Sequence, residues 1–196
     1  MRVIVVHAHP DTESFNHSLC DVAVGALRRS GHEVDLFDLY ADGFDARLTT
    51  AERIAYETDS PILDAYVARS AVAIAAADAL LFVYPTWWFG PPAVLKGWLE
   101  RVLVPGVGFS LDPKTNKVKS GLRNVRRLGA VTTYGSPKWS IFLMADGGRR
   151  LVKRCVRAMC SLRCRTTWLG LYGMDASTDA DRTEFLAQVD RELSNW

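Results

Sequence analysis

Five short apolar runs, separated by stretches of helical periodicity, constrain the fold of this chain more than any other feature. The runs cover residues 3–7, 33–39, 79–84, 128–133 and 166–172. Their length and their content of Val, Ile and Leu are typical of buried parallel strands. The segments 15–30, 62–77, 93–104, 140–160 and 179–193 carry apolar residues at helical spacing. This alternation predicts an α/β domain with a five-stranded, mostly parallel sheet.

Composition and length agree with one domain over residues 1–196. Apolar residues make up 48% of the chain and charged residues 23%, which excludes a disordered or fibrous protein. Within the sequence, no apolar run reaches the roughly 20 residues that a membrane-spanning helix needs. The run Val3–Val6 is too short for the core of a signal peptide. The sequence therefore predicts a soluble, cytoplasmic protein without a membrane span.

The charge is distributed unevenly along the chain. Residues 1–100 contain 7 Lys/Arg and 14 Asp/Glu, whereas residues 101–196 contain 17 and 8. The densest basic stretch, 149–165, holds seven Lys or Arg and no acidic residue. A solvated helix face and a site for a small anionic molecule are both consistent with it. Nucleic acid binding is disfavoured, because the domain as a whole is not strongly basic.

Local signals mark several boundaries of the expected elements. Gly31 predicts the end of the helix at 15–30, and Thr49 with Glu52 forms a potential capping box for a short helix. Gly147 and Gly148 are expected to interrupt the helix at 140–160. The polar stretch 105–127 is expected to form a long excursion between a helix and a strand.

Three loops should meet at one edge of the sheet. In open parallel sheets, ligands bind outside the carboxyl ends of the strands, which here points to the loops 7–14, 85–91 and 132–137. In the first loop, Ser14 and Asn16 begin a predicted helix, where free N–H groups favour an anion such as phosphate. Ser14 is equally suited to be a simple N-cap. Neither a P-loop nor a G-x-G-x-x-G motif is present in the sequence.

The second and third loops carry aromatic and hydroxyl side chains. The second loop carries three large aromatic residues, Trp87, Trp88 and Phe89, between proline and glycine residues. Because loops normally lie on the surface, these rings are expected to pack against a flat ligand, a second subunit or the protein core. The third loop, 132–137, offers Thr and Ser hydroxyls, or is a plain turn. The sequence contains no evident nucleophile–base pair, carboxylate dyad or metal cluster. A cofactor is therefore expected to supply the chemistry.

Two segments carry a family resemblance. They are His7-Ala-His9-Pro10 with Ser14-Phe15-Asn16, and Tyr84-Pro85-x-x-Trp88-Phe89-Gly90-x-Pro92-Ala93-x-Leu95-Lys96-Gly97-Trp98. Together with Val131-Thr132-Thr133 they resemble the flavodoxin-like NAD(P)H:quinone oxidoreductases, the DT-diaphorase family. The resemblance covers about residues 3–40, 79–103 and 128–136. It implies a three-layer flavodoxin-like fold, a bound flavin and a homodimer.

The resemblance also implies which residues bind the cofactor. The first loop would hold the flavin phosphate or pyrophosphate, and the other two loops would hold the ring system. The implied cofactor-binding residues are His9, Ser14, Phe15, Asn16, Pro85, Thr86, Trp87, Trp88, Phe89, Thr132, Thr133, Tyr134 and Gly135. The family usually has glycine where this chain has Tyr134, and the Tyr134 hydroxyl or backbone N–H groups would stabilise charge on the reduced flavin.

The implied activity is ping-pong transfer of hydride from NADPH or NADH to a quinone or similar acceptor. FAD is favoured over FMN, because the first loop resembles that of FAD-binding members. Two further classes remain open: a docking subunit of a larger system that keeps the flavin fold, and an interaction protein with an empty cleft.

Overall fold

Five parallel strands form the central sheet of the computed structural model, which describes residues 1–58 and 60–196. Their order across the sheet is β2 (Glu33–Asp38), β1 (Arg2–His7), β3 (Ala79–Pro85), β6 (Arg127–Tyr134) and β7 (Arg165–Tyr172). Every neighbouring pair is parallel, so the predicted five-stranded sheet is confirmed. The chain runs from β1 outward to β2 and then returns to place β3 on the other side of β1.

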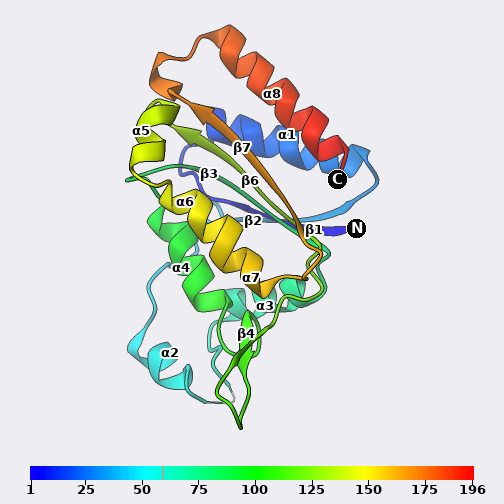
Figure 1. Ribbon diagram of the computed structural model, residues 1–196, viewed down its shortest axis with the longest axis vertical. Helices are drawn as coiled ribbons and strands as arrows, with labels where there is room; N and C mark the ends of the chain where they lie inside the picture. The colour runs from blue at the N-terminus through cyan, green and yellow to red at the C-terminus, as the bar shows by residue number, and fades with distance from the viewer. Residues whose placement is uncertain (59) are drawn as a thin grey trace.

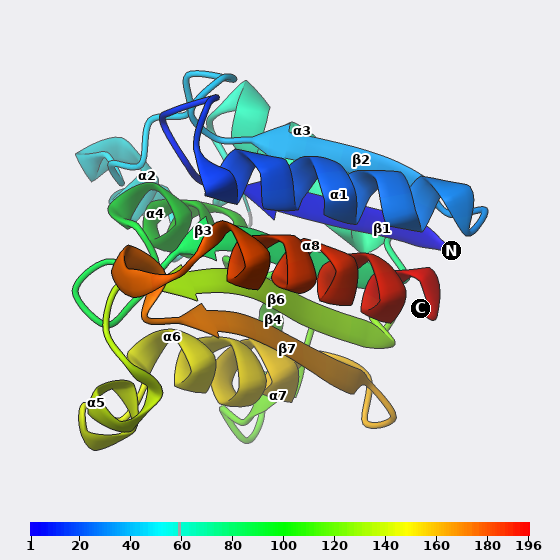
Figure 2. The ribbon, with the colours of Figure 1, turned by 90° about the horizontal axis from the view of Figure 1, so that it is seen from above.

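Helices cover both faces of the sheet (Figures 1 and 2). Helices α1 (Phe15–Arg29) and α8 (Asp179–Ser194) lie on one face, where they enclose Val3 and Val5 of β1. Helices α3 (Ala65–Ala75) and α4 (Ala93–Val102) cover the other face with the segment that follows α5. The strand β3 is buried along its whole length because both of its faces are covered. The fold thus has the three layers expected.

The ends of the helices follow the local signals in the sequence. Gly31 adopts a φ of 78°, a left-handed conformation that ends α1 at little steric cost. The Thr49 side chain accepts the Glu52 N–H, and the Glu52 carboxylate accepts the Thr49 N–H. This capping box begins the short helix α2 (Thr50–Ala55).

The helix expected over residues 140–160 is divided differently from the prediction. It comprises α5 (Lys138–Leu143), α6 (Gly147–Arg150), a π-helical turn (Leu151–Val156) and α7 (Arg157–Met159). The break lies at 144–146, and the two glycines begin the second helix. They are needed there because the loop after β3 packs against α6. A Cβ atom on Gly147 would lie 3.0 Å from the Phe89 carbonyl oxygen.

The long excursion contains a small hairpin that the sequence did not reveal. Strands β4 (Phe109–Leu111) and β5 (Val118–Ser120) pair antiparallel and project away from the main sheet (Figure 1). After β7, a 3₁₀ turn (Met174–Ala176) leads to α8. Among the described residues, the helices are too short or too polar to cross a membrane.

Candidate active site

The carboxyl ends of β1 and β3 mark the point where the strand order reverses. The connection after β1 leads to β2 on one side, and the connection after β3 leads to β6 on the other. The two loops therefore separate and leave a crevice, which is where open α/β sheets bind ligands.

A cleft with two adjoining hollows occupies this crevice. The larger has a volume of about 400 Å³ and is lined by His9, Ser14, Phe15, Asn16, Pro85, Thr86, Trp87, Thr133, Gly135, Met174 and Asp175. The smaller has about 260 Å³ and is lined by Thr86, Trp88, Phe89, Tyr134, Gly135, Ser136 and Ile141. Thr86 and Gly135 contribute to both hollows. The structure thus brings together all the predicted cofactor residues except Thr132.

Thr132 supports the cleft from within the sheet. It is fully buried in β6, and its hydroxyl lies 2.9 Å from the Thr86 hydroxyl. The Thr86 N–H also donates to the Thr133 carbonyl oxygen at 2.8 Å. These contacts fix the start of the loop after β3 against β6. Thr132 therefore holds a lining residue in place without lining the cleft itself.

The loop after β1 combines a helix cap with an unpaired amide. The Ser14 hydroxyl accepts the His17 N–H at 3.2 Å, as an N-cap does, and donates to the Asp11 carbonyl oxygen at 2.7 Å. Asn16 is only 3% exposed, and neither its amide nitrogen nor its amide oxygen has a hydrogen-bond partner. Buried polar groups are almost always paired, so an unpaired amide beside a cleft suits a polar ligand.

The loop after β3 is a tight turn with bulky residues in unfavourable conformations. The N–H and carbonyl groups of Trp87 and Gly90 form two reciprocal hydrogen bonds of 3.0 Å. Between them, Trp88 and Phe89 have φ values of 48° and 60°, a region that side chains of this size rarely adopt. The cost is of order 1–3 kcal/mol per residue, and such strain is concentrated at functional sites. Trp88 is 96% exposed, which excludes the core as its partner.

Tyr134 closes the inner side of the smaller hollow. Its ring is buried and stacks on Tyr172 with a centroid separation of 4.4 Å. Its hydroxyl donates to Asp146 Oδ2 at 3.0 Å. Burial, followed by the charge of Asp146, raises the pKa of the Tyr134 hydroxyl well above its usual range. Tyr134 therefore remains a neutral phenol at physiological pH.

Three lining residues lie outside the loops selected from the sequence: Ile141, Met174 and Asp175. Ser136 lies in the selected third loop but was not among the predicted cofactor residues. Met174 and Asp175 follow the fifth strand, so the rule that selected the other three loops would also have selected theirs. A Cβ atom on Gly135 would lie 2.9 Å from Asp175 Oδ2. The larger hollow therefore has an acidic group beside the third loop, and it has no Lys or Arg among the described lining residues.

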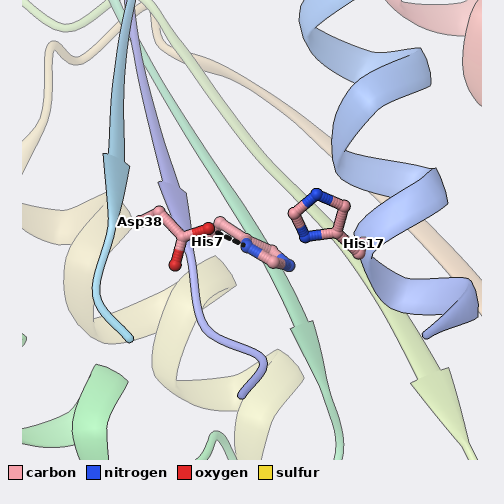
Figure 3. Close-up of side chains that lie close together, drawn as sticks. All are labelled: His7, His17 and Asp38. Atoms are coloured by element: carbon pink, nitrogen blue, oxygen red, sulfur yellow. Dashed lines mark hydrogen bonds and ion pairs between the residues drawn. The ribbon is translucent and has the colours of Figure 1, made fainter. Parts of the chain in front are cut away.

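A cluster of His7, His17 and Asp38 lies at the carboxyl end of β1, next to the start of α1 (Figure 3). Potential ligand atoms of the three lie within 4.8 Å of one another, although no metal cluster was evident from the sequence. His7 Nδ1 lies 3.0 Å from Asp38 Oδ2 and carries the proton, because a carboxylate only accepts. His17 approaches His7 edge-on from the opposite side. Burial lowers the pKa of His7, and the contact with Asp38 only partly offsets this. These contacts pair Nδ1 of His7, whereas its buried Nε2 has no hydrogen-bond partner among the described residues.

Comparison with known proteins places this chain in a family. A sequence profile of the flavodoxin-like fold family matches residues 1–193. The chain belongs to this family. Ribosyldihydronicotinamide dehydrogenase (quinone) from Mus musculus is 32% identical to it, in an alignment that covers 99% of this chain and 91% of the relative.

Two further relatives agree with this placement. NAD(P)H dehydrogenase (quinone) 1 from Rattus norvegicus is 35% identical over 69% of this chain and 54% of its own length, so the chain spans about half of that relative. The solved structure of NAD(P)H:quinone oxidoreductase from Methanothermobacter marburgensis is 27% identical, with a TM-score of 0.77 over 100% of this chain and 95% of that one. The resemblance to flavodoxin-like NAD(P)H:quinone oxidoreductases is therefore confirmed.

Proposed function

We propose that this protein is a flavin-dependent NAD(P)H:quinone oxidoreductase. It would transfer two electrons, as hydride, from NADPH or NADH to a quinone or similar acceptor by a ping-pong mechanism. The names of the relatives support the reaction class. The observation in this chain that supports it best is the unpaired, buried Asn16 amide beside a cleft at the strand switch point.

The residues of the cleft fit a flavin. N–H and hydroxyl groups of the first loop suit a phosphate, and the aromatic turn after β3 suits a flat ring system. A bound flavin would supply the atom that accepts and then donates the hydride. Trp88 and Phe89 would hold the flavin and the substrate stacked and correctly oriented, which lowers the entropic part of the activation barrier.

We further propose FAD rather than FMN as the cofactor. The carboxylate of Asp175 lines the hollow that would take the phosphate end, and no described lining residue there is Lys or Arg. The diphosphate of FAD spreads two negative charges over two phosphates, whereas the FMN monoester carries a charge close to −2 on one phosphate, which this hollow has no basic side chain among its described lining residues to pair. The main support for FAD is that the first loop resembles that of FAD-binding members.

Tyr134 is the proposed side chain for stabilising negative charge that develops on the flavin. Because its hydroxyl donates to Asp146, that hydrogen bond would have to change partner, and backbone N–H groups of the same loop are the alternative donors. The variant Tyr134→Phe distinguishes them. A fall in kcat of about 100-fold, the usual loss for one such donor, would assign the role to the hydroxyl, and unchanged kcat would assign it to the backbone.

A homodimer is also proposed. Trp88 at the cleft is almost fully exposed, and Trp139, Leu143 and Met144 on or next to α5 are more than half exposed. Large apolar side chains grouped in this way are typical of surfaces that another molecule covers. Light scattering at the concentration used for kinetics would measure the mass, and a monomer would contradict the proposal.

The decisive experiment combines cofactor analysis with turnover. The purified protein is denatured, the released flavin is identified by chromatography, and oxidation of NADPH and NADH is followed with and without menadione. We expect bound FAD, quinone-dependent oxidation and parallel lines in double-reciprocal plots. Bound flavin without turnover would instead support a docking subunit, and absence of flavin would contradict both interpretations.

A further inference from the structure

A third hollow lies beside the cleft, at the corner between α5 and α6. It has a volume of about 520 Å³ and is lined by Phe142, Ala145, Asp146, Arg149, Arg150, Lys153 and Arg154. We call it the basic groove. Asp146 forms a shared wall, because its carboxylate accepts the hydroxyl of Tyr134, which lines the cleft. A volume of this size is in the range that accommodates part of a nucleotide.

The positive charge of the basic groove exceeds its negative charge by three, since four basic side chains and one acidic side chain line it. Asp146 is its one acidic lining residue among those described, and its oxygens already accept the Arg149 backbone N–H and the Tyr134 hydroxyl. Among the described residues, none of the four basic side chains forms an ion pair. Among the described residues, the groove therefore presents four cations, and the carboxylate of Asp146 is the one negative side chain that faces them.

This arrangement departs from the rest of the molecule. Arg149 and Lys153, like Arg150 and Arg154, are like charges four residues apart, a spacing that places them on one helix face and destabilises the helix slightly. Elsewhere the same spacing pairs opposite charges, as in Arg53–Glu57 and Lys96–Glu100. Proteins tolerate unfavourable local spacings of this kind at functional sites, where a bound anion would offset the repulsion between the basic side chains.

We infer that the basic groove binds the 2′-phosphate of NADPH and makes NADPH the preferred reductant. This inference rests on the proposed function. The 2′-phosphate is a dianion, and Arg149, Arg150, Lys153 and Arg154 would neutralise it, while the exposed ring of Phe142 offers an apolar wall for the adenine. The neighbouring cleft would hold the nicotinamide of the same molecule.

Binding of three probes tests the inference directly, without turnover. Adenosine 2′,5′-bisphosphate carries the 2′-phosphate, adenosine 5′-monophosphate lacks it, and adenosine 3′,5′-bisphosphate carries the second phosphate at the wrong position. By calorimetry on the purified protein, we expect the 2′,5′ probe to bind at least tenfold more tightly than the monophosphate and more tightly than the 3′,5′ isomer. Equal affinity for the 2′,5′ probe and the monophosphate, or for the two bisphosphates, would overturn the inference.

Two double variants locate the effect. Arg150→Gln/Lys153→Gln removes two charges from the groove, whereas Arg163→Gln/Arg165→Gln removes two exposed charges that do not line it. The groove variant should lose about tenfold in affinity for the 2′,5′ probe and raise KM for NADPH with KM for NADH nearly unchanged. The control should retain both. Equal losses in the two variants would show a general charge effect and refute the inference.

The outcomes separate this inference from the proposed function. If the groove variant loses the 2′,5′ probe but the protein oxidises no NAD(P)H, the binding site stands and the proposed reaction fails. If the protein reduces quinone equally well with NADPH and NADH, and the groove variant changes neither KM, the reaction stands and the groove inference fails.

Discussion

Replacing Asn16 by leucine should stabilise the apoprotein and weaken flavin binding at the same time. Asn16 is almost completely buried, and both polar atoms of its amide lack a partner. A buried, unsatisfied polar group costs about 1–3 kcal/mol, whereas a leucine side chain of similar size has no polar group to satisfy. We therefore expect Asn16→Leu to raise the free energy of unfolding of the apoprotein by about 1–3 kcal/mol. For a domain of this size each kcal/mol corresponds to about 2–4 °C in Tm.

The same substitution removes a donor and an acceptor from the cleft. If the amide pairs with the flavin, its loss should weaken flavin binding by about 10- to 100-fold, since about 1.4 kcal/mol corresponds to one decade in Kd. Asn16→Asp would place a carboxylate against the flavin phosphate and should also reduce the flavin retained after gel filtration.

Asn124 provides the matched control, because both N–H groups of its amide are paired. Its Nδ2 donates to the carbonyl oxygens of Ile74 and Ala77 at 2.8 and 2.7 Å. Asn124→Leu should therefore lower the Tm of the apoprotein and leave flavin affinity unchanged. Tm is measured by thermal unfolding and Kd by fluorescence titration. If Asn16→Leu lowers Tm as Asn124→Leu does, or if it leaves flavin affinity unchanged, the reasoning is refuted.

Three further predictions follow from individual side chains. Trp88→Ala should lower kcat/KM for a quinone by about tenfold, which is the contribution of one aromatic contact. The circular dichroism spectrum should not change, because the ring is exposed. Normal turnover would show that this turn is not part of the active site. Arg101→Met leaves the carboxylate of Glu52 buried without its partner and should lower the free energy of unfolding in urea by about 3 kcal/mol. Lys96→Met removes one side of an exposed ion pair and should lower it by less than about 1 kcal/mol. Similar losses in the two variants would contradict the prediction. Because burial lowers the pKa of His7 below that of the unfolded chain, the unfolded state binds more protons as the pH falls from 7 to 5. The contribution of His7 should lower the free energy of unfolding, measured by urea unfolding, by at most about 1.4 kcal/mol per pH unit over that range. An equally steep decrease in the variant His7→Gln would show that His7 is not its source.

Much of the site could be predicted from short stretches of sequence. The apolar runs located all five strands, and the positions directly after them located most of the residues that line the cleft. The capping box at Thr49 and Glu52 and the left-handed Gly31 were predicted correctly as well. These features depend on side-chain periodicity and on hydrogen bonds within one turn, so a few neighbouring residues are enough to specify them.

What the sequence could not reveal depends on contacts between distant segments. The hydrogen bond from Tyr134 to Asp146 and the approach of Asp175 to Gly135 each join parts of the chain that no local pattern relates. The same holds for Asn16, whose lack of a partner is apparent only when every neighbouring segment is in place. Local periodicity fixes which residues form strands and helices. The packing of whole elements decides which polar groups are buried, which remain unpaired, and which charges are left for a ligand to neutralise.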